Sequence, residues 1–237
     1  MNPDLTFFLS HVRFDLVCPN PSVLRGLCAI WKGALKPQMP TECHVEFEVR
    51  PYQVLCDGKV VDEVEDSRQL LPRTELAIYN FFLETHRHLT VMHAALLQHG
   101  EQTLLLAGPS GSGKSSLSMA AVSAGWQYRT DELSVTDGKR LWGIPRAIQF
   151  DATCIGDTQP GFLETTDSES YRFRHPVYGA MYQPLVTVSA PKGQIELPRL
   201  EEVSTIILRS GRKETLEPLD GINALKHLHR ACFLLPQ

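Results

Sequence analysis

Hydrophobic and polar residues alternate in several stretches of the first third of the chain, which is the pattern of half-buried strands. The clearest alternation covers residues 12–16 and returns over residues 45–49. Apolar runs flank Asp57-Gly58, a dipeptide that favours a two-residue turn, so a hairpin is predicted there. Helical spacing of apolar residues predicts a short helix within residues 19–31 and a longer one over residues 67–87.

From residue 89 onward the pattern changes to closely spaced strands. The strands predicted there cover residues 90–98, 102–107, 126–130, 133–135, 140–143, 186–189, 203–208 and 215–219. Helices are predicted over residues 114–124 and 220–232, and residues 151–184, which show no clear period, predict a long functional loop. Because strands and helices do not alternate regularly, we expect a strand-rich α/β protein and not a doubly wound sheet.

A glycine-rich loop follows the apolar run 103–107 and precedes the first helix of this region. It fits the phosphate-binding pattern G-x-x-x-x-G-K-[ST], in which glycines let successive backbone N–H groups approach a polyphosphate. The expected nucleotide-binding residues are Gly108, Pro109, Ser110, Gly111, Ser112, Gly113, Lys114, Ser115 and Ser116. Lys114 is placed to reach the β- and γ-phosphates, and the Ser115 hydroxyl to ligate Mg²⁺.

A surface turn rich in glycine and serine is the competing interpretation of this loop. Two glycines five residues apart are expected about once in a chain of this length. Requiring Lys and then Ser or Thr lowers that expectation to the order of one in a hundred. The pattern therefore favours binding of a nucleoside triphosphate.

Composition and net charge argue against several classes of function. The chain has 237 residues and a net charge of −4, so no basic field favours nucleic acid or an anionic membrane. Its six cysteines show no C-x-x-C pair and no metal-like spacing with histidine, which favours free thiols. Neither a signal-peptide pattern nor an apolar stretch of membrane-spanning length is found. We therefore expect a cytoplasmic protein with no nucleic-acid or membrane partner.

Two further features accompany the glycine-rich loop. Asp131 and Glu132 stand at the end of the strand that follows the loop and its helix, so this strand is expected to return beside the loop. Neighbouring residues of a strand point to opposite faces, so one acid can face the γ-phosphate. His93 lies one strand before the loop, although a histidine between Met92 and Ala94 is also typical of a core position.

These segments together resemble the HPr kinase/phosphorylase group, and especially its shorter HPr kinase-related serine kinases. The similarity covers residues 89–150, and more loosely residues 198–199 and 216–219. The segments that carry it are His93-Ala-Ala, the stretch LLLAGPSGSGKSSL over residues 104–117, Gly125-Trp, Thr130-Asp-Glu-Leu and Ile144-Pro-Arg. The resemblance implies a strand-rich P-loop kinase core of the HPr kinase/PEP carboxykinase-like type over residues 89–237. Residues 1–88 would then form an N-terminal α+β module packed on that core.

The resemblance also implies roles for individual residues. In that group the first acid of the pair is the base for the acceptor serine, and the second helps to bind the metal. Carried over, Asp131 is the catalytic base, with His93 tuning its charge, and Lys114 is the third catalytic residue. Ser115 and Glu132 are the metal ligands, and the implied cofactors are ATP and Mg²⁺. The resemblance further suggests a homo-oligomer.

The chain departs from the longer members of the group, which carry two aspartates where this chain has Asp131 and Glu132. Their signatures for recognising a carrier protein are not found in residues 151–198. The expected acceptor is therefore a serine of a peptide or protein, or free serine, with residues 151–184 as the candidate recognition loop. Arg146 and Arg199 are candidates for neutralising the transferred charge, or are ordinary surface arginines.

Three alternatives to a serine kinase remain. A nucleotide-binding regulatory ATPase would release phosphate without a phosphorylated product. A small-molecule kinase usually places its metal-binding aspartate farther along the chain and has an arginine-rich lid, and here only Arg172 and Arg174 lie close together. A scaffold that retains an ancestral loop is disfavoured because Lys114, Ser115 and both acids are intact.

Overall fold

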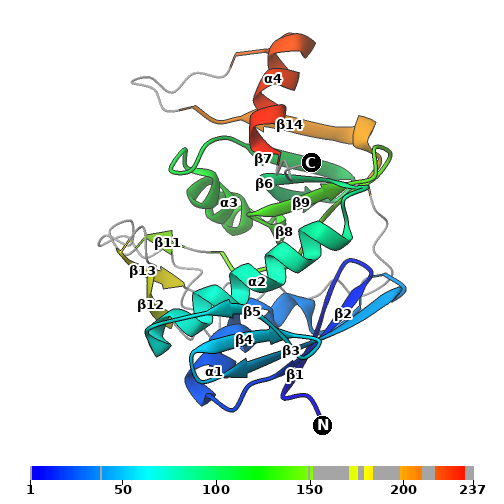
Figure 1. Cartoon of the computed structure of the whole chain (residues 1–237). Coiled ribbons are helices and arrows are strands. Elements are labelled where there is room, and N and C mark those ends of the chain that lie inside the picture. The colour runs from blue at the N-terminus through cyan, green and yellow to red at the C-terminus, as the bar shows by residue number, and fades with distance from the viewer. Residues whose placement is uncertain are drawn as a thin grey trace. The chain divides into compact units, whose positions relative to one another are not determined.

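The computed structural model describes residues 2–37, 39–148, 150–151, 171–175, 179–183, 198–209 and 217–232 (Figure 1). The fold is mixed α/β, with two mixed sheets and few helices in the described part. Contacts group the chain into unit 1, which is Met1–His86 with Pro145–Ile195, and unit 2, which is Arg87–Ile144 with Glu196–Gln237. The expected division after residue 88 lies close to the first of these boundaries. Residues 145–195, by contrast, group with the N-terminal part and not with the glycine-rich loop.

Unit 1 contains a five-stranded sheet in the order β1-β2-β3-β4-β5. Its strands are β1 (Leu5–Leu9), β2 (Val12–Val17), β3 (Cys43–Arg50), β4 (Gln53–Cys56) and β5 (Lys59–Glu63). β2 and β3 are parallel and the other neighbours are antiparallel. The predicted hairpin is confirmed, because β4 and β5 turn at Asp57 and Gly58, both with positive φ.

Both predicted helices of unit 1 are present. α1 (Pro21–Ile30) begins after Asn20, whose side chain accepts the N–H groups of Ser22 and Val23 and so caps the helix. α2 (Leu70–Thr85) follows a 3₁₀ turn at Ser67–Gln69, which together cover most of the predicted range 67–87.

The strand β1 is not predicted by the sequence pattern. Its residues Leu-Thr-Phe-Phe-Leu contain one polar residue, so the alternation of a half-buried strand is hidden. In the structure Leu5, Phe7 and Leu9 are nevertheless buried, while Phe8 is partly exposed. The Phe7 ring stacks on Phe14 of β2 at a centroid distance of 5.1 Å, so packing across the sheet settles which face turns inward.

The prediction of a loop over residues 151–184 is wrong for the residues described there. β11 (Phe150–Asp151), β12 (Tyr171–His175) and β13 (Gly179–Gln183) form an antiparallel sheet in the order β11-β13-β12. Aromatic and basic residues alternate in the sequence of β12, which is a strand signal that the surrounding Thr, Gly and Pro residues obscured. The rest of this stretch and the predicted strand 186–189 lie outside the described residues.

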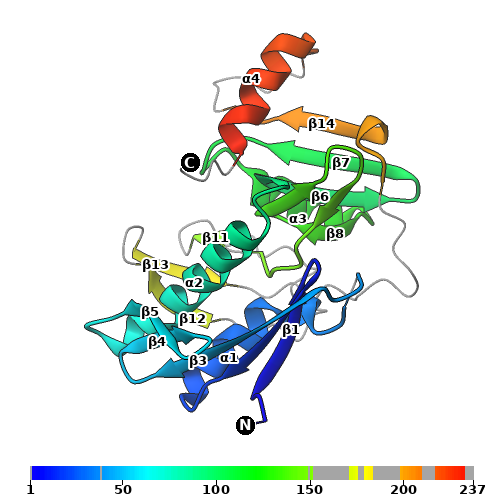
Figure 2. The same cartoon turned by 45° about the vertical axis from the view of Figure 1, so that its right-hand side comes forward.

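Unit 2 contains a sheet in the order β10-β9-β6-β7-β14, with β8 also paired to β6. Its strands are β6 (Thr90–His99), β7 (Gln102–Ala107), β8 (Gln127–Thr130), β9 (Leu133–Thr136), β10 (Leu141–Gly143) and β14 (Val203–Ile207). All six correspond to predicted strands, whereas residues 217–219 of the predicted strand 215–219 are not in a strand. β14 runs parallel to β7, and the other pairings are antiparallel (Figure 2).

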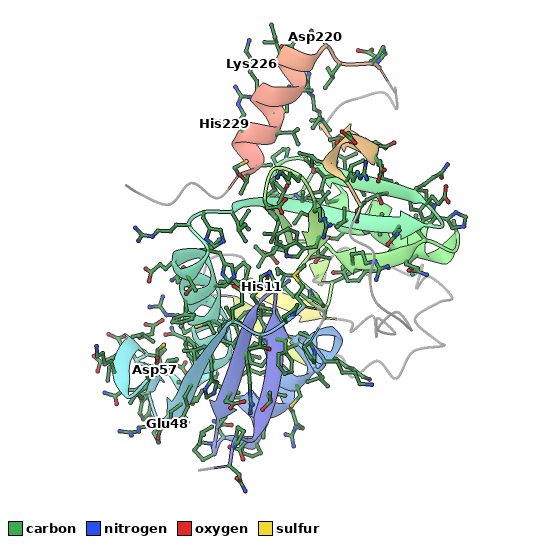
Figure 3. The ribbon with its side chains drawn as sticks, turned by 90° about the vertical axis from the view of Figure 1, so that its right-hand side faces the viewer. His11, Glu48, Asp57, Asp220, Lys226 and His229 are labelled. Carbon is green, nitrogen blue, oxygen red and sulfur yellow. The ribbon has the colours of Figure 1, made fainter. Side chains whose placement is uncertain are left out.

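Two predicted helices complete unit 2, α3 (Lys114–Ser123) and α4 (Gly221–Ala231). α4 begins at Asp220, whose carboxylate accepts the N–H of Asn223, and carries Lys226 and His229 along its length (Figure 3). None of the helices in the described ranges is both long and apolar enough to cross a membrane.

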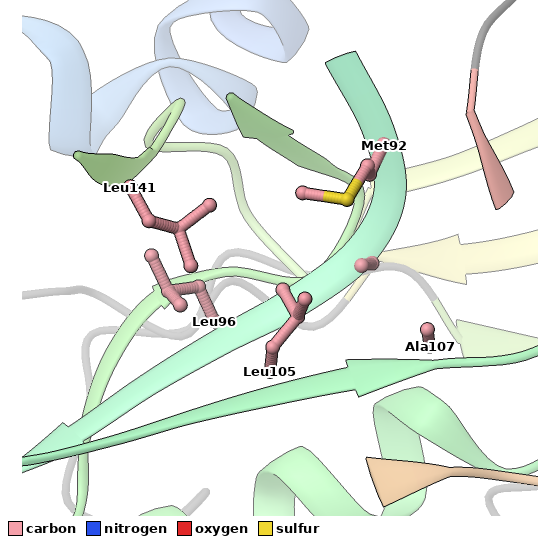
Figure 4. Close-up of a cluster of buried hydrophobic side chains, with 6 residues drawn as sticks. Met92, Leu96, Leu105, Ala107 and Leu141 are labelled. Carbon is pink, nitrogen blue, oxygen red and sulfur yellow. The ribbon is translucent and has the colours of Figure 1, made fainter. Parts of the chain in front are cut away.

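One face of the unit 2 sheet carries a hydrophobic cluster (Figure 4). Its buried members are Met92, Ala94, Leu96, Leu105, Ala107 and Leu141. Leu228 and Ala231 of α4 pack against this cluster, so α4 covers the face to which the even-numbered residues of β6 point. The odd-numbered residues, among them His93, therefore belong to the opposite face.

A buried ion pair joins α2 to the segment that follows Ile144 in unit 1. The guanidinium of Arg146 donates to the carboxylate of Glu75 at 2.7 Å, and their side chains are 3% and 7% exposed. The same guanidinium carbon lies 5.7 Å from the centroid of the Tyr79 ring. Arg146 is therefore an interior residue of unit 1, and the interpretation of Arg146 as an ordinary surface arginine is wrong.

Replacing Arg146 with methionine is expected to lower the free energy of unfolding by about 3–5 kcal/mol, because the Glu75 carboxylate would stay buried without its cation. Urea denaturation measures this loss. The matched control is Arg68→Met, since Arg68 forms an exposed ion pair with Asp66, and we expect no change in the denaturation midpoint. Equal midpoints for both variants would show that the buried pair does not stabilise the fold.

Candidate functional site

The glycine-rich loop connects β7 to α3, as the sequence predicts. Gly111 and Gly113 have φ values of 76° and 93°, in the left-handed region where a side chain would be strained. Lys114 is the first residue of α3, so the unpaired N–H groups of the first helical turn open into the loop. These donors and the helix dipole make the loop suited to an anion such as a phosphate.

Lys114 folds back onto the loop itself. Its ammonium donates to the carbonyl oxygens of Gly108 at 2.8 Å and Pro109 at 3.1 Å, and the residue is only 6% exposed. Burial lowers the pKa of Lys114, while the charges of Asp131 and Glu132 act in the opposite direction. The loop thus holds a desolvated cation whose carbonyl partners an entering phosphate can replace.

Asp131 and Glu132 lie between β8 and β9, two strands that pair one after the other with β6. β8 and β9 pair with the same edge of β6, and Leu96 opposite Thr130 and His93 opposite Leu133 share one register. The intervening residues 131–132 therefore lie against residues 94–95, and the N–H of Ala94 donates to the carbonyl of Glu132 at 3.3 Å. Since β7 pairs with the other edge of β6 at Ala94, the acids and the start of the loop are two strands apart.

Asp131 is the acid that contacts the loop. Its Oδ2 accepts the Ser115 hydroxyl at 3.1 Å, and its Oδ1 accepts the Tyr128 hydroxyl at 3.0 Å. Asp131 is 5% exposed, so these two donors offset part of the cost of burying a carboxylate. Glu132 is partly exposed, and its charge also acts on Lys114.

Thr130 shapes the turn that carries the acids. Its side chain is fully buried, and its Oγ1 accepts the N–H groups of Glu132 at 3.3 Å and Leu133 at 3.2 Å. The hydroxyl thus supplies an acceptor for the N–H groups of Glu132 and Leu133 where the strand is interrupted. His93 of β6 lies opposite Leu133, which follows this turn, as the sequence predicts, and is partly exposed.

β14 lies against the start of the loop. The N–H of Leu208 donates to the carbonyl of Ala107 at 2.7 Å, one residue beyond the parallel pairing of β14 with β7. A Cβ added to Gly108 would lie 2.7 Å from the Leu208 carbonyl oxygen. Glycine is therefore required at position 108 for close approach of the last strand.

The two arginines that the sequence offers as candidates lie in different units, and a third arginine follows β14. Arg146 lies in unit 1 against Glu75, so its charge is already compensated. Arg199 is 72% exposed and lies 3.7 Å from Glu201. Arg209, which the sequence patterns did not single out, follows β14 beside the loop and donates to His227 of α4. Arg209 thus directly follows Leu208, the residue hydrogen-bonded to the end of β7 where the glycine-rich loop begins.

Tyr128 and Thr130 are the site residues that sequence reasoning missed. Both belong to β8, and sequence reasoning assigned no role to either: Tyr128 was interpreted only as a strand position, and Thr130 only as part of a segment that carries the resemblance. A weak signal existed for Thr130, because a threonine hydroxyl can accept a backbone N–H two residues further on in a turn. No sequence signal marks Tyr128, since its contact with Asp131 depends on a register shift between β6 and β8.

The described residues contain no group of three His, Cys, Asp or Glu side chains arranged to hold a metal ion. The oxygen donors Ser115 and Asp131 nevertheless suit Mg²⁺, which is usually bound by one or two protein oxygens together with phosphates and water. Comparison with protein-family models and with curated proteins finds no match to this chain.

Replacing Thr130 with valine is expected to destabilise the protein by about 1–3 kcal/mol, because the buried N–H of Leu133 and the partly buried N–H of Glu132 lose their acceptor. Thr130→Ser keeps the oxygen and is the matched control, with a smaller loss from the missing methyl group. Urea denaturation of both variants measures the difference. A Thr130→Val protein as stable as Thr130→Ser would contradict the role of the hydroxyl.

The lowered pKa of Lys114 predicts a pH dependence. In the free protein the ammonium should lose its proton at a pH below its usual value of 10.5, because burial disfavours the charged form. Added tripolyphosphate should move the transition to higher pH, since a nearby anion favours the ammonium. NMR of lysine ε-carbons follows both transitions, and Lys114→Arg assigns the signal. A free-protein midpoint at or above 10.5 would contradict this prediction.

Proposed function

We propose that the chain is an ATP- and Mg²⁺-dependent kinase that transfers the γ-phosphate to a serine hydroxyl of a peptide, a protein or free serine. The observation that carries the proposal is the hydrogen bond between Ser115, at the start of the phosphate-loop helix, and the buried carboxylate of Asp131. This bond joins a phosphate cradle to an acid that can act beside the bound phosphates.

In this proposal each residue of the site has a separate role. Backbone N–H groups of the loop, with Gly111 and Gly113 in left-handed conformation, bind the phosphates. Lys114 leaves its carbonyl partners and contacts the β- and γ-phosphates. Ser115 and Glu132 would hold Mg²⁺, which supplies charge neutralisation at the phosphates.

In the transfer step the acceptor oxygen forms a bond to the γ-phosphorus while the bond from that phosphorus to the bridging oxygen breaks, and ADP leaves. The proton of the acceptor hydroxyl passes to Asp131. A carboxylate is a weak base, so Asp131 orients the hydroxyl and accepts the proton late in the step. His93, on the strand next to the acids, is proposed to tune the charge of Asp131.

The two acids have competing assignments. The resemblance gives the metal to Glu132, whereas the Ser115 hydroxyl contacts Asp131 in the structure. Glu132→Gln and Asp131→Asn separate these roles. Replacing the acid that binds the metal should raise the half-saturating Mg²⁺ concentration. Replacing an acid that acts only as the base should leave that concentration unchanged.

The function is tested by incubating the protein with γ-labelled ATP, Mg²⁺ and either free serine or serine-containing peptides, followed by mass spectrometry of the products. Phosphate on a serine hydroxyl supports the kinase. Free phosphate without a phosphorylated product supports the regulatory ATPase, and phosphate on another small molecule supports a small-molecule kinase.

Two variants test the residue roles. Lys114→Ala is expected to abolish ATP binding, because the phosphates lose their buried cation. Asp131→Asn should keep ATP binding and lower kcat by about 10²–10⁴, the usual range for a general base. Calorimetry measures binding and the labelled assay measures kcat.

The matched control is Glu101→Gln, which removes a carboxylate from the exposed turn between β6 and β7 of the same unit. It should leave both binding and transfer unchanged. Full transfer activity in Asp131→Asn would contradict the assignment of Asp131 as the base.

A further inference from the structure

Asp131 has both carboxylate oxygens engaged by hydroxyl groups. Oδ2 accepts Ser115 from the phosphate loop, and Oδ1 accepts Tyr128 from the strand that precedes the acid. Tyr128 is 3% exposed and Asp131 is 5% exposed, so their hydrogen bond is buried, whereas the bond from Ser115 is partly buried. A hydrogen bond from a buried, rigid phenol restricts the rotation of a carboxylate more than water does.

The contact depends on an irregularity in the strand. Residues three apart in a regular strand point to opposite faces, so Tyr128 and Asp131 would not meet. Between Leu97 opposite Tyr128 and Leu96 opposite Thr130 the register shifts by one residue, which leaves Arg129 as the extra residue of a bulge. The bulge brings the side chains of Tyr128 and Asp131 to the same face.

The bulge is held by its own polar contacts. The guanidinium of Arg129 donates to the Gln98 side-chain oxygen at 2.7 and 3.2 Å, and to that of Gln127 at 3.0 Å. Gln98 belongs to β6 and lies opposite Gln127 of β8. Arg129 therefore holds β8 against β6 at the bulge, next to Tyr128.

From this arrangement we propose that Tyr128 is a positioning residue: it holds the Asp131 carboxylate in the orientation in which Oδ2 faces Ser115. The proposal rests on the proposed function for its catalytic consequence, but the orientation of Asp131 towards Ser115 is a property of the protein without substrate. In this proposal the tyrosine acts through Asp131.

The test is Tyr128→Phe, which removes the hydroxyl and keeps the buried ring. We expect kcat for transfer to fall about tenfold, the lower end for residues that orient a ligand or acid. KM for ATP should change less than twofold, because Lys114 and the loop are intact. A merely structural role would lower the melting temperature and the active fraction without this split between kcat and KM.

Tyr52→Phe is the matched control, since Tyr52 is 53% exposed in unit 1, and it should behave as the unmodified protein. The double variant Tyr128→Phe/Asp131→Asn gives a second readout. If Tyr128 acts through Asp131, the double variant should be no slower than Asp131→Asn alone. An added loss of about tenfold in the double variant would overturn the proposal.

The orientation of Asp131 in the nucleotide-free protein keeps the two proposals distinguishable. In a crystal structure of Tyr128→Phe, the Asp131 carboxylate should turn so that its Oδ2 no longer accepts the Ser115 hydroxyl, even if no acceptor is found and the kinase proposal fails. An Asp131 carboxylate that keeps its orientation and its bond to Ser115 in this variant would overturn the positioning role, whatever the function of the site.

Discussion

Pairing of β6 with two different strands along one edge is the constraint on which the rest of the site depends. β9 occupies the first part of that edge and β8 the second, and the two acids fall in the interval between them. The other edge of β6 carries β7, from which the glycine-rich loop departs. Backbone hydrogen bonds across three strands therefore fix the separation between loop and acids, and side chains adjust only the final contacts.

Much of unit 2 could be predicted from the sequence, because its signals are local. Glycines at 111 and 113 require left-handed backbone, and the apolar run before Gly108 marks a buried strand. The placement of Asp131 beside the loop also follows from counting one helix and one strand. The contact of Asp131 with Tyr128 could not be predicted, since a one-residue bulge reverses which side chains share a face.

Unit 1 shows why other parts escaped prediction. The strand β1 lacks visible alternation because Phe8 is apolar yet partly exposed, and only pairing with β2 decides its inward face. Arg146 belongs to one of the segments that carry the resemblance, which suggested a role in transfer. Its partner Glu75 is 71 residues away, and such distant pairing leaves no local pattern.

The contact between Leu208 and Gly108 has a consequence for synthesis of the protein. β14 pairs with β7 across 100 residues of chain, with a large part of unit 1 inserted between them. Contacts of such long sequence separation form late in folding. A nascent chain still attached to the ribosome thus carries every residue of the glycine-rich loop while the neighbouring strand is missing. The glycine-rich loop acquires its neighbouring strand only after translation has passed residue 208, so the sheet around the loop closes late in the synthesis of the chain.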